Sequence, residues 1–405
     1  MPLLERENVV KSYKQGTHRI EAPCDTLARV KPLFADMGIT RLANLTGLDR
    51  IGIPVVSATR PNSRSVSISQ GKGTSLDAAM ASAAMEAIES YHAERITLPL
   101  KLGSHRELSS HHDLVDVDEL PKLKAGAWHP DRQIVWIEGR NIMADNTLWL
   151  PYEVVHSNFT VPAVSGSGCF VSSTNGLASG NHLLEAISHG ICEVVERDAN
   201  SLWNQLAEPA RASTRIDNST IKDRDCQVSL NALQNAGFAV GIWDMTGDVG
   251  IPAFYCLIVD ERDSLGHSGG GAGCHLDPAI AASRAITEAI QVRTNYIAGV
   301  RDDLGQSEYQ SGEVNSKNEH ARWLMGLACE NPINFGSFED QSSDCFSTDI
   351  EILLDRLRKV GIEQVLCVDL TRETYGIPVV RIVIPGLEGP DDHEDYLPGR
   401  RAGGD

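Results

Sequence analysis

Apolar residues recur with helical spacing in three long segments of the chain. Residues 182–203 carry one continuous apolar stripe, formed by Leu184, Ile187, Ile191, Val195 and Leu202. Residues 75–95 are rich in alanine and open at Ser75, a suitable N-cap, so a helix here can approach a neighbour closely. Residues 277–298 open with Asp277 as N-cap and a proline at the first helical position. The pattern therefore predicts three long helices.

Short β-branched and aromatic runs lie between the predicted helices. Three of them begin with Gly-Ile-Pro, at residues 52–56, 250–254 and 376–380, which places the proline near a strand start, where no ladder donor is lost. They are either one unit used three times or three unrelated turn-to-strand entries. Two polar stretches, residues 101–124 and 302–319, are interpreted as surface loops. Strands alternating with long helices predict an α/β or α+β fold, in which mixed β-sheets pack with the helices.

The composition narrows the class of protein. The 405 residues are 41% hydrophobic, so a sizeable core needs no disulfide or metal. A formal charge of −19 repels phosphate backbones and anionic membrane surfaces, and the apolar runs are far shorter than the roughly 20 residues of a bilayer crossing. Nine scattered cysteines fit reduced thiols, and the first twenty residues lack a signal-type apolar stretch. We therefore expect a cytoplasmic protein with no nucleic-acid or membrane partner.

Polar side chains gather on one face of each predicted helix, and on two of the helices they are acids. On a helix, Glu185, Glu193 and Glu196 project away from the apolar stripe, and Glu86 and Glu89 lie one turn apart. The third helix carries a polar line formed by Arg284, Glu288, Gln291 and Asn295. For any single glutamate, a solvated surface position is an equally good interpretation. Three such faces, each beside a Gly-rich stretch, favour a common site.

The Gly-rich stretches are residues 69–73, 165–168 and 269–273, and we interpret them as loops whose backbone N–H groups approach an anion. Acids that converge on one site raise one another's pKa values and require cations. Mg²⁺ is the natural candidate, because it takes oxygen ligands and bridges carboxylates to phosphates. The phosphate oxygens that the metal leaves uncovered would be contacted by Lys72, Arg197 and Arg284.

Several blocks of the chain, taken in order, resemble the signature of the YcaO family. The blocks are residues 69–73, 82–89, 175–181, 193–198 and 272–291, and the resemblance covers roughly residues 46–390. It implies a YcaO-like fold in which the ATP site lies between helices. Residues 1–45 would form a lead-in segment and residues 46–405 the catalytic domain, with the signature core at about 64–300 and a C-terminal strand and tail at 360–405.

The resemblance also implies an activity, the ATP- and Mg²⁺-dependent activation of a backbone amide in a peptide or protein. In such enzymes a nucleophile adds to the carbonyl, ATP phosphorylates the amide oxygen, and phosphate leaves. A Cys, Ser or Thr side chain of the substrate gives an azoline ring, whereas external sulfide gives a thioamide. A metal-rich site would neutralise the charge that shifts during the transfer.

The family's site residues carry over position by position. The resemblance implies Mg²⁺ ligands at Glu86, Glu89, Glu185, Glu193, Glu196 and Glu288. It implies nucleotide contacts at Ser69, Lys72, Glu86, Asn175, Glu185, Arg197, Arg284 and Gln291. Catalytic roles fall on Lys72, Glu196 and Arg197. This chemistry demands no His or Cys nucleophile, so His275, beside the third Gly-rich stretch, is interpreted as structural.

The end of the chain departs from the azoline-forming members, which often finish in Pro-x-Pro-x-Pro. Residues 383–388 and 396–405 look more like YcaO proteins that work beside a TfuA protein in thioamide formation. We therefore expect a thioamide-forming enzyme that acts on a peptide or protein with a TfuA-like partner, and a homodimer, as is common in the family. Two alternatives stay open: azoline formation on a precursor peptide, and a non-catalytic accessory role in ribosomal-protein methylthiolation.

Overall fold

The chain folds into two compact units of mixed helices and sheets, which confirms the expected fold class. The computed structural model describes residues 8–126, 128–263, 266–390 and 395–403, so residues 1–7 and 404–405, on which part of the expectations about the two ends rests, lie outside the described residues. Unit 1 comprises residues 1–11, 88–205 and 343–405, and unit 2 comprises residues 12–87 and 206–342. Helix α3 (Leu76–Ala93) begins in unit 2 and ends in unit 1.

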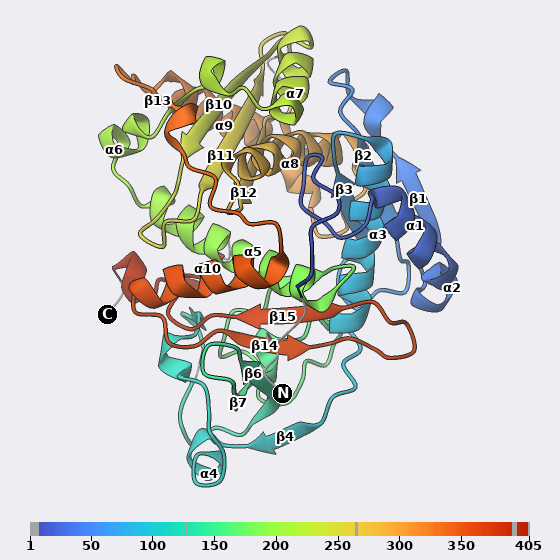
Figure 1. Cartoon of the computed structure of the whole chain (residues 1–405), viewed down its shortest axis with the longest axis vertical. Coiled ribbons are helices and arrows are strands. Elements are labelled where there is room, and N and C mark those ends of the chain that lie inside the picture. Colours follow the sequence, from blue (N-terminus) through green and yellow to red (C-terminus); the bar gives the residue numbers. More distant parts are fainter. Residues whose placement is uncertain (1–7, 127, 264–265, 391–394, 404–405) are drawn as a thin grey trace. The chain divides into compact units, whose positions relative to one another are not determined.

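Unit 1 is built on a six-stranded antiparallel sheet. Its strands run in the order β4 (Leu100–Gly103), β6 (Ile134–Asn141), β14 (Leu366–Asp369), β15 (Val379–Val383) and β8 (Leu177–Ser179), with β7 (Asn146–Pro151) paired to β6. Helix α5 (Leu183–Asn204) packs against β8 and β15, and α10 (Phe346–Lys359) packs against α5 (Figure 1). The sheet therefore supports the helix that carries four of the predicted site residues.

The other elements of unit 1 are short. They are α4 (His105–Leu108), β5 (Lys122–Leu123) paired with β16 (Tyr396–Leu397), and 3-10 turns at Val117–Glu119, Tyr152–Val154 and Arg400–Ala402. Residues 101–124 are thus not the plain loop that their polarity predicts. Ser104 and Glu107 form a capping box, in which each side chain accepts the other's backbone N–H, and this starts α4 within a polar sequence.

Unit 2 contains two three-stranded antiparallel sheets. One is formed by β1 (Arg41–Asn44), β2 (Val55–Thr59) and β3 (Ile68–Lys72), and the other by β10 (Phe238–Asp244), β11 (Ala253–Asp260) and β12 (Gly269–Cys274). Helix α8 (Pro278–Ala298) packs against β11 and β12, and α7 (Arg224–Asn235) packs against α8 and β10 (Figure 1). Ile242, Phe254 and Ile286 lie in the buried core between these elements.

The remaining elements of unit 2 include one long helix that the sequence did not predict. They are α1 (Pro23–Val30), α2 (Phe34–Met37), α6 (Glu208–Ser213), α9 (Ser311–Gly326), β9 (Ile216–Asp217) paired with β13 (Ile333–Asn334), and 3-10 turns at Lys31–Leu33, Thr46–Leu48, Asn218–Thr220, Gln306–Tyr309 and Phe335–Ser337. The expectation of a loop at residues 302–319 is wrong, because α9 starts inside it. The buried face of α9 is narrow and includes Asn318 among Val314, Ala321 and Leu324, so its apolar period is weak.

The three Gly-Ile-Pro segments each begin the same arrangement of two strands and a helix, called a repeat below. In each, the strand that follows pairs antiparallel with a second strand, and a long helix begins four residues after that strand ends: β2, β3 and α3; β11, β12 and α8; β15, β8 and α5. The register is shared, with Val55 opposite Lys72, Ala253 opposite Cys274, and Val379 opposite Ser179. In the third case the chain order is permuted, since β8 and α5 precede β15. This confirms the interpretation of one unit used three times.

The three predicted helices are α3, α5 and α8, and each begins at a side-chain cap. Ser75 accepts a hydrogen bond from the backbone N–H of Ala78, and Asp277 accepts one from that of Ala279. His182 caps α5 through its ring nitrogen, which accepts from the backbone N–H of Leu184. Local capping chemistry therefore sets the position of all three helices that carry the candidate site.

The Gly-rich stretches do not form the anion-binding loops that we expected. Residues 69–73 lie mostly in β3 and residues 269–273 lie in β12. A Cβ on Gly71 would overlap the backbone of α3, and one on Gly273 would overlap the backbone of α8. Glycine is therefore used here so that a helix can approach a strand closely. At residues 165–168 one backbone N–H does meet an anion, but it is the protein's own Glu153, which accepts from Gly168.

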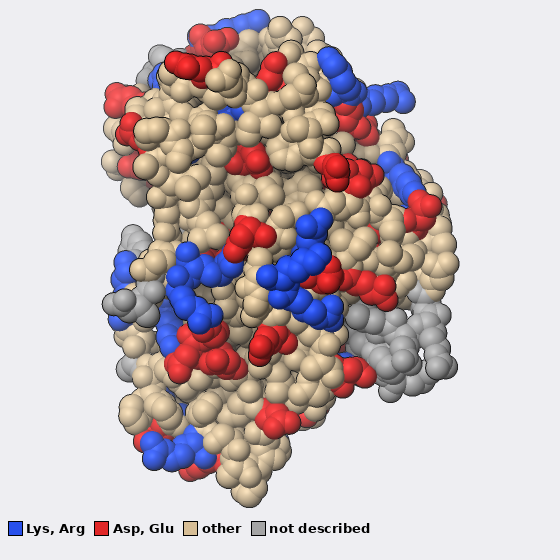
Figure 2. Space-filling model, turned by 60° about the vertical axis from the view of Figure 1, so that its left-hand side comes forward, with Lys and Arg blue, Asp and Glu red and all other residues tan. Residues whose placement is uncertain are grey.

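The distribution of charged side chains and the burial of the cysteines can be compared with what the composition predicts. Lys and Arg side chains lie among Asp and Glu side chains on the face drawn in Figure 2. All nine cysteines are free and six of them are buried, which confirms their interpretation as mostly core residues. Within the described ranges, none of the helices has the length and apolarity to span a membrane.

Candidate functional site

Each repeat places two polar residues at the same positions of its helix. Fourteen residues after its second strand ends stand Glu86, Glu193 and Glu288, and three residues further stand Glu89, Glu196 and Gln291. Residues three apart on a helix share one face. Sequence reasoning found all six residues from helical period alone. It did not find their equivalence, because the strand ends that define the common spacing were not known.

Unit 1 buries two of its predicted acidic residues. Glu185 is 1% exposed and Glu196 2% exposed, so the alternative of a solvated position is wrong for these two. Nη2 of Arg197 lies 3.4 Å from Oε1 of Glu196. Ser179 donates both its backbone N–H and its hydroxyl to Glu89, at 2.8 and 2.6 Å. Buried carboxylates are costly unless cations and donors balance them, so Glu185 and Glu196 are candidates for contact with a cation.

Unit 2 contains Lys72 and helix α8, the third of the predicted helices. Lys72, at the end of β3, forms an ion pair with Glu288 of α8. Ser69 and Gln291 are buried, Arg284 and Glu288 are half-buried, and Glu86 is exposed. The Lys72 ammonium is therefore held by a carboxylate in this arrangement, and a phosphate that bound Lys72 would have to compete with Glu288 or share it through a metal ion.

The predicted residues fall into two sets, one in each unit. Glu89, Asn175, Glu185, Glu193, Glu196 and Arg197 belong to unit 1, and Ser69, Lys72, Glu86, Arg284, Glu288 and Gln291 belong to unit 2. That the two sets meet around one nucleotide stays a prediction. Among the described residues, no three Asp, Glu, His or Cys side chains form a group that could hold a metal ion. Since Mg²⁺ commonly takes one or two carboxylates and completes its shell with phosphate oxygens, these donors fit an ion that arrives with a nucleotide.

A family model covers most of the chain and decides its family. The model is described as YcaO cyclodehydratase, ATP- and Mg²⁺-binding, and it matches residues 70–388. The chain belongs to the YcaO family. ATP and Mg²⁺ are accordingly its cofactors, as the sequence predicted.

Relatives and solved structures agree with this family. A protein of Rhizobium leguminosarum bv. trifolii, whose name places it in the tfuA 3′ region, is 37% identical over 386 residues, which cover 91% of this chain and 88% of the relative. A protein of Methanothermobacter thermautotrophicus is 37% identical over 375 residues, which cover 90% and 94%. The structure of YcaO from Methanopyrus kandleri bound with AMPPCP and Mg²⁺ gives a TM-score of 0.73 at 23% identity, covering 94% and 95%.

A longer structure shares the same fold. The structure described as a heterocyclase in complex with substrate and cofactor gives a TM-score of 0.77 at 23% identity. It covers 96% of this chain, but this chain spans only 55% of the heterocyclase's length. At this identity the likeness concerns the fold alone, and the likeness to the YcaO structure from Methanopyrus kandleri confirms the YcaO fold.

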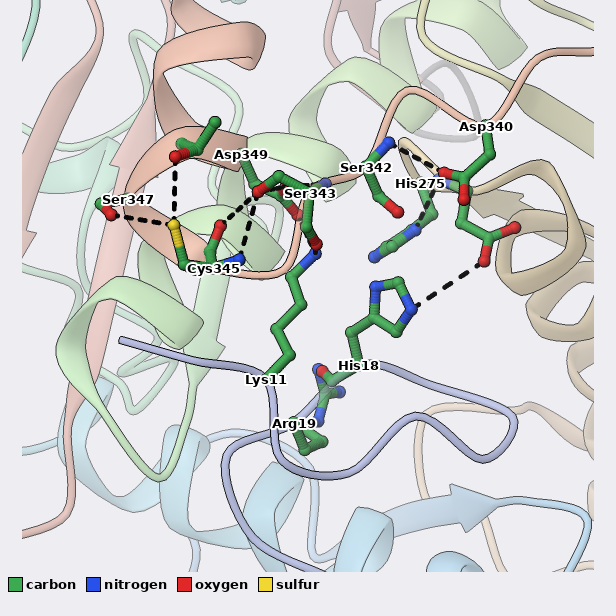
Figure 3. Close-up of polar contacts among 12 residues, drawn as sticks. Lys11, His18, Arg19, His275, Asp340, Ser342, Ser343, Cys345, Ser347 and Asp349 are labelled. Atoms are coloured by element: carbon green, nitrogen blue, oxygen red, sulfur yellow. Dashed lines mark hydrogen bonds and ion pairs between the residues drawn. The ribbon is translucent and has the colours of Figure 1, made fainter. Parts of the chain in front are cut away.

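His275 has a structural environment. Its Nδ1 accepts the backbone N–H of Asp277 at 2.9 Å, and Asp277 in turn caps α8. Its ring meets the ring of His18 edge to face, with centroids 5.2 Å apart (Figure 3). These contacts account for His275 as part of the helix start and support its interpretation as structural.

Several buried charged side chains of unit 1 were missed by sequence reasoning, among them Lys11, Asp198 and Arg381. Lys11 donates to the Asp349 carboxylate and to the carbonyl of Ser343 (Figure 3). Asp198 is fully buried and accepts two hydrogen bonds from Arg401. Arg381 is fully buried in β15. The position of Asp198 directly after Arg197 was a weak sequence signal for its burial. The sequence gives no such signal for Lys11 or Arg381, because the burial of a single charged residue produces no repeating pattern along the chain.

His156 makes unit 1 sensitive to acid. Burial, with a further contribution from Arg381, lowers the pKa of His156 to about 4 from 6.5. Between about pH 6.5 and pH 4, His156 is protonated in the unfolded chain but neutral in the folded chain. The free energy of unfolding therefore falls as the pH drops through this range. We expect a loss of about 2 kcal/mol between pH 7 and pH 5, measured by denaturant unfolding.

The matched control for this effect is the exposed His111. His156→Gln should flatten the stability profile between pH 7 and pH 5, whereas His111→Gln should leave it unchanged. The neutral form is required at His156 because its Nδ1 accepts the backbone N–H of Asn158 at 3.1 Å. An unaltered profile in His156→Gln would contradict this assignment.

Proposed function

We propose that this chain uses ATP and Mg²⁺ to phosphorylate the oxygen of a backbone amide in a peptide or protein, and that sulfide then replaces this oxygen to give a thioamide. A TfuA-like partner would help to deliver the sulfur. The observation that carries the choice of sulfide is the relative from the tfuA 3′ region, which is 37% identical over 91% of this chain. The family assignment carries the amide activation.

The chemistry uses the residues of the predicted set. Lys72 and Arg197 would bind the phosphate oxygens of ATP, and the carboxylates of Glu86, Glu193 and Glu196 would hold Mg²⁺. The bound metal neutralises charge on the phosphates. The sulfide sulfur forms a bond to the amide carbon, the amide oxygen takes the γ-phosphoryl group, and the C–O bond breaks to release phosphate. One amide, one hydrogen sulfide and one ATP thus give one thioamide, one ADP and one phosphate.

The path of the amide oxygen tests this proposal. The chain is incubated with ATP, Mg²⁺, sodium sulfide and a displayed library of random-sequence peptides, with and without a TfuA-like protein. A modified peptide is then synthesised with ¹⁸O in the reacting amide. We expect a mass gain equal to the exchange of one oxygen for sulfur, and ¹⁸O in the released phosphate. Phosphate without ¹⁸O would contradict amide phosphorylation.

Azoline formation is the second candidate. It is favoured by the description of the family as cyclodehydratases. The same assay distinguishes it, because a ring closed by a Cys, Ser or Thr side chain removes one water from the peptide and needs no sulfide. An accessory role in methylthiolation would give neither mass change nor phosphate release, and the presence of the full set of predicted acids speaks against it.

A further inference from the structure

Arg381 is an unusual residue in the centre of unit 1. It lies in β15 and is fully buried. Its Nε donates to the carbonyl of Val155 at 3.0 Å, Nη1 to the carbonyl of Asn175 at 2.7 Å, and Nη2 to the hydroxyl of Ser157 at 3.1 Å. All three acceptors are neutral. A buried guanidinium bonded only to neutral groups is costly unless charge from further away balances it.

The balancing charge comes from two predicted metal ligands. Burial lowers the pKa of Arg381 to about 10, while the carboxylates of Glu193 and Glu89 act in the opposite direction and raise it. At neutral pH the guanidinium therefore stays protonated and lies within the field of both acids. Its charge is fixed in place, because three hydrogen bonds hold it and solvent does not reach it.

The hydrogen bonds of Arg381 also join the elements that carry these acids. Ser157, one of its acceptors, donates its backbone N–H to the carbonyl of Ala93 at the end of α3, one turn beyond Glu89. Asn175, another acceptor, lies in the turn before β8, which leads into α5 and Glu193. One guanidinium thus ties the end of one acidic helix to the start of the other.

The other two repeats have no charge at this position. Arg381 lies opposite Leu177 in the strand ladder, and the equivalent residues of the other repeats are Ser57, opposite Gln70, and Tyr255, opposite Ala272. The shared packing of strand and helix therefore does not require a guanidinium. The charge is specific to the repeat whose surroundings contain both Glu89 and Glu193.

We propose that Arg381 is a positioning residue that provides the fixed counter-charge of Glu89 and Glu193, so that these acids bind Mg²⁺ weakly alone and tightly only together with a nucleotide. This rests on the proposed function of the same acids. A free divalent cation entering beside a fixed positive charge is repelled, whereas the phosphates of ATP are attracted by it. Arg381 thereby makes metal binding depend on the nucleotide.

Four variants of the full-length chain separate charge from structure. Arg381→Gln removes the charge, and Ser157→Asp offsets it while leaving Arg381 in place. Arg381→Lys and Ser157→Ala keep the charge and disturb the same contacts. Mg²⁺ affinity without nucleotide is measured by calorimetry. KM for ATP and kcat are measured by phosphate release with a peptide that the unaltered chain accepts as substrate.

We expect the two charge-neutralising variants to bind free Mg²⁺ about tenfold more tightly and to raise KM for ATP about tenfold. Arg381→Lys and Ser157→Ala should stay close to the unaltered chain in both quantities. The proposal would be overturned if a folded charge-neutralising variant, Arg381→Gln or Ser157→Asp, bound free Mg²⁺ as the unaltered chain does and lost activity only in proportion to its loss of thermal stability. Absence of Mg²⁺-dependent nucleotide binding in the unaltered chain would instead overturn the proposed function itself.

Discussion

Replacing Glu196 by Gln is expected to reduce ATP-dependent peptide modification about a thousandfold. Glu196 is buried on α5, and its carboxylate lies 3.4 Å from the guanidinium of Arg197. Glutamine keeps the shape of the side chain but removes the charge that would hold a metal ion and orient Arg197 toward phosphate. Loss of one fixed electrostatic group in a water-excluded site commonly lowers the rate by factors of this size.

The matched control for this variant is Glu351→Gln. Glu351 is an exposed acid on α10 of the same unit, so the same change of chemistry there should leave phosphate release and the unfolding temperature unaltered. The rate is measured as phosphate release with a substrate peptide, and folding is checked by thermal unfolding. A Glu196→Gln enzyme that works as well as the Glu351→Gln control would refute the role of this acid.

Gly71→Ala is expected to destabilise the protein by about 4 kcal/mol or more. The added methyl group would overlap the carbonyl oxygen of Ala79 and the backbone nitrogen of Ala83, and it would lie 2.8 Å from Cα of Ala83. All three atoms belong to the backbone of α3, so no side chain can move aside. Either β3 and α3 separate or the helix distorts, and both expose buried area.

Gly312→Ala is the control for this prediction. Gly312 lies in the first turns of α9, and a Cβ there meets no atom within 4 Å. Alanine should therefore be neutral or should stabilise the chain by less than about 1 kcal/mol. Denaturant midpoints of both variants give the comparison. Equal midpoints for Gly71→Ala and Gly312→Ala would mean that β3 and α3 are not packed as closely as described.

The long helices were predictable because their signals are local. Ser75 and Asp277 are capping residues at the helix starts, and the apolar stripe of residues 182–203 repeats over several turns. The glycine stretches were misjudged for the opposite reason. A run such as residues 269–273, four glycines and one alanine, has no apolar period, and only the helix packed against it shows that the glycines serve a close approach.

The candidate site was predictable in part for the same reason. Glu193 and Glu196 lie three apart on a helix, and this spacing is visible in the sequence. The ion pair between Lys72 and Glu288 and the burial of Arg381 depend on contacts between residues far apart in the chain. No local pattern encodes such contacts, so the structure was needed to find them.

The central claim is that the predicted acids, Glu86 and Glu196 among them, bind Mg²⁺ together with a nucleotide, and binding of a non-hydrolysable ATP analogue tests it most directly. Calorimetry with and without Mg²⁺ is carried out on the unaltered chain, on Glu86→Gln in unit 2 and on Glu196→Gln in unit 1. We predict Mg²⁺-dependent binding that weakens about a hundredfold in each variant, as expected when a charged partner is lost. Binding that needs no Mg²⁺, or that is unchanged in either variant, would contradict the account.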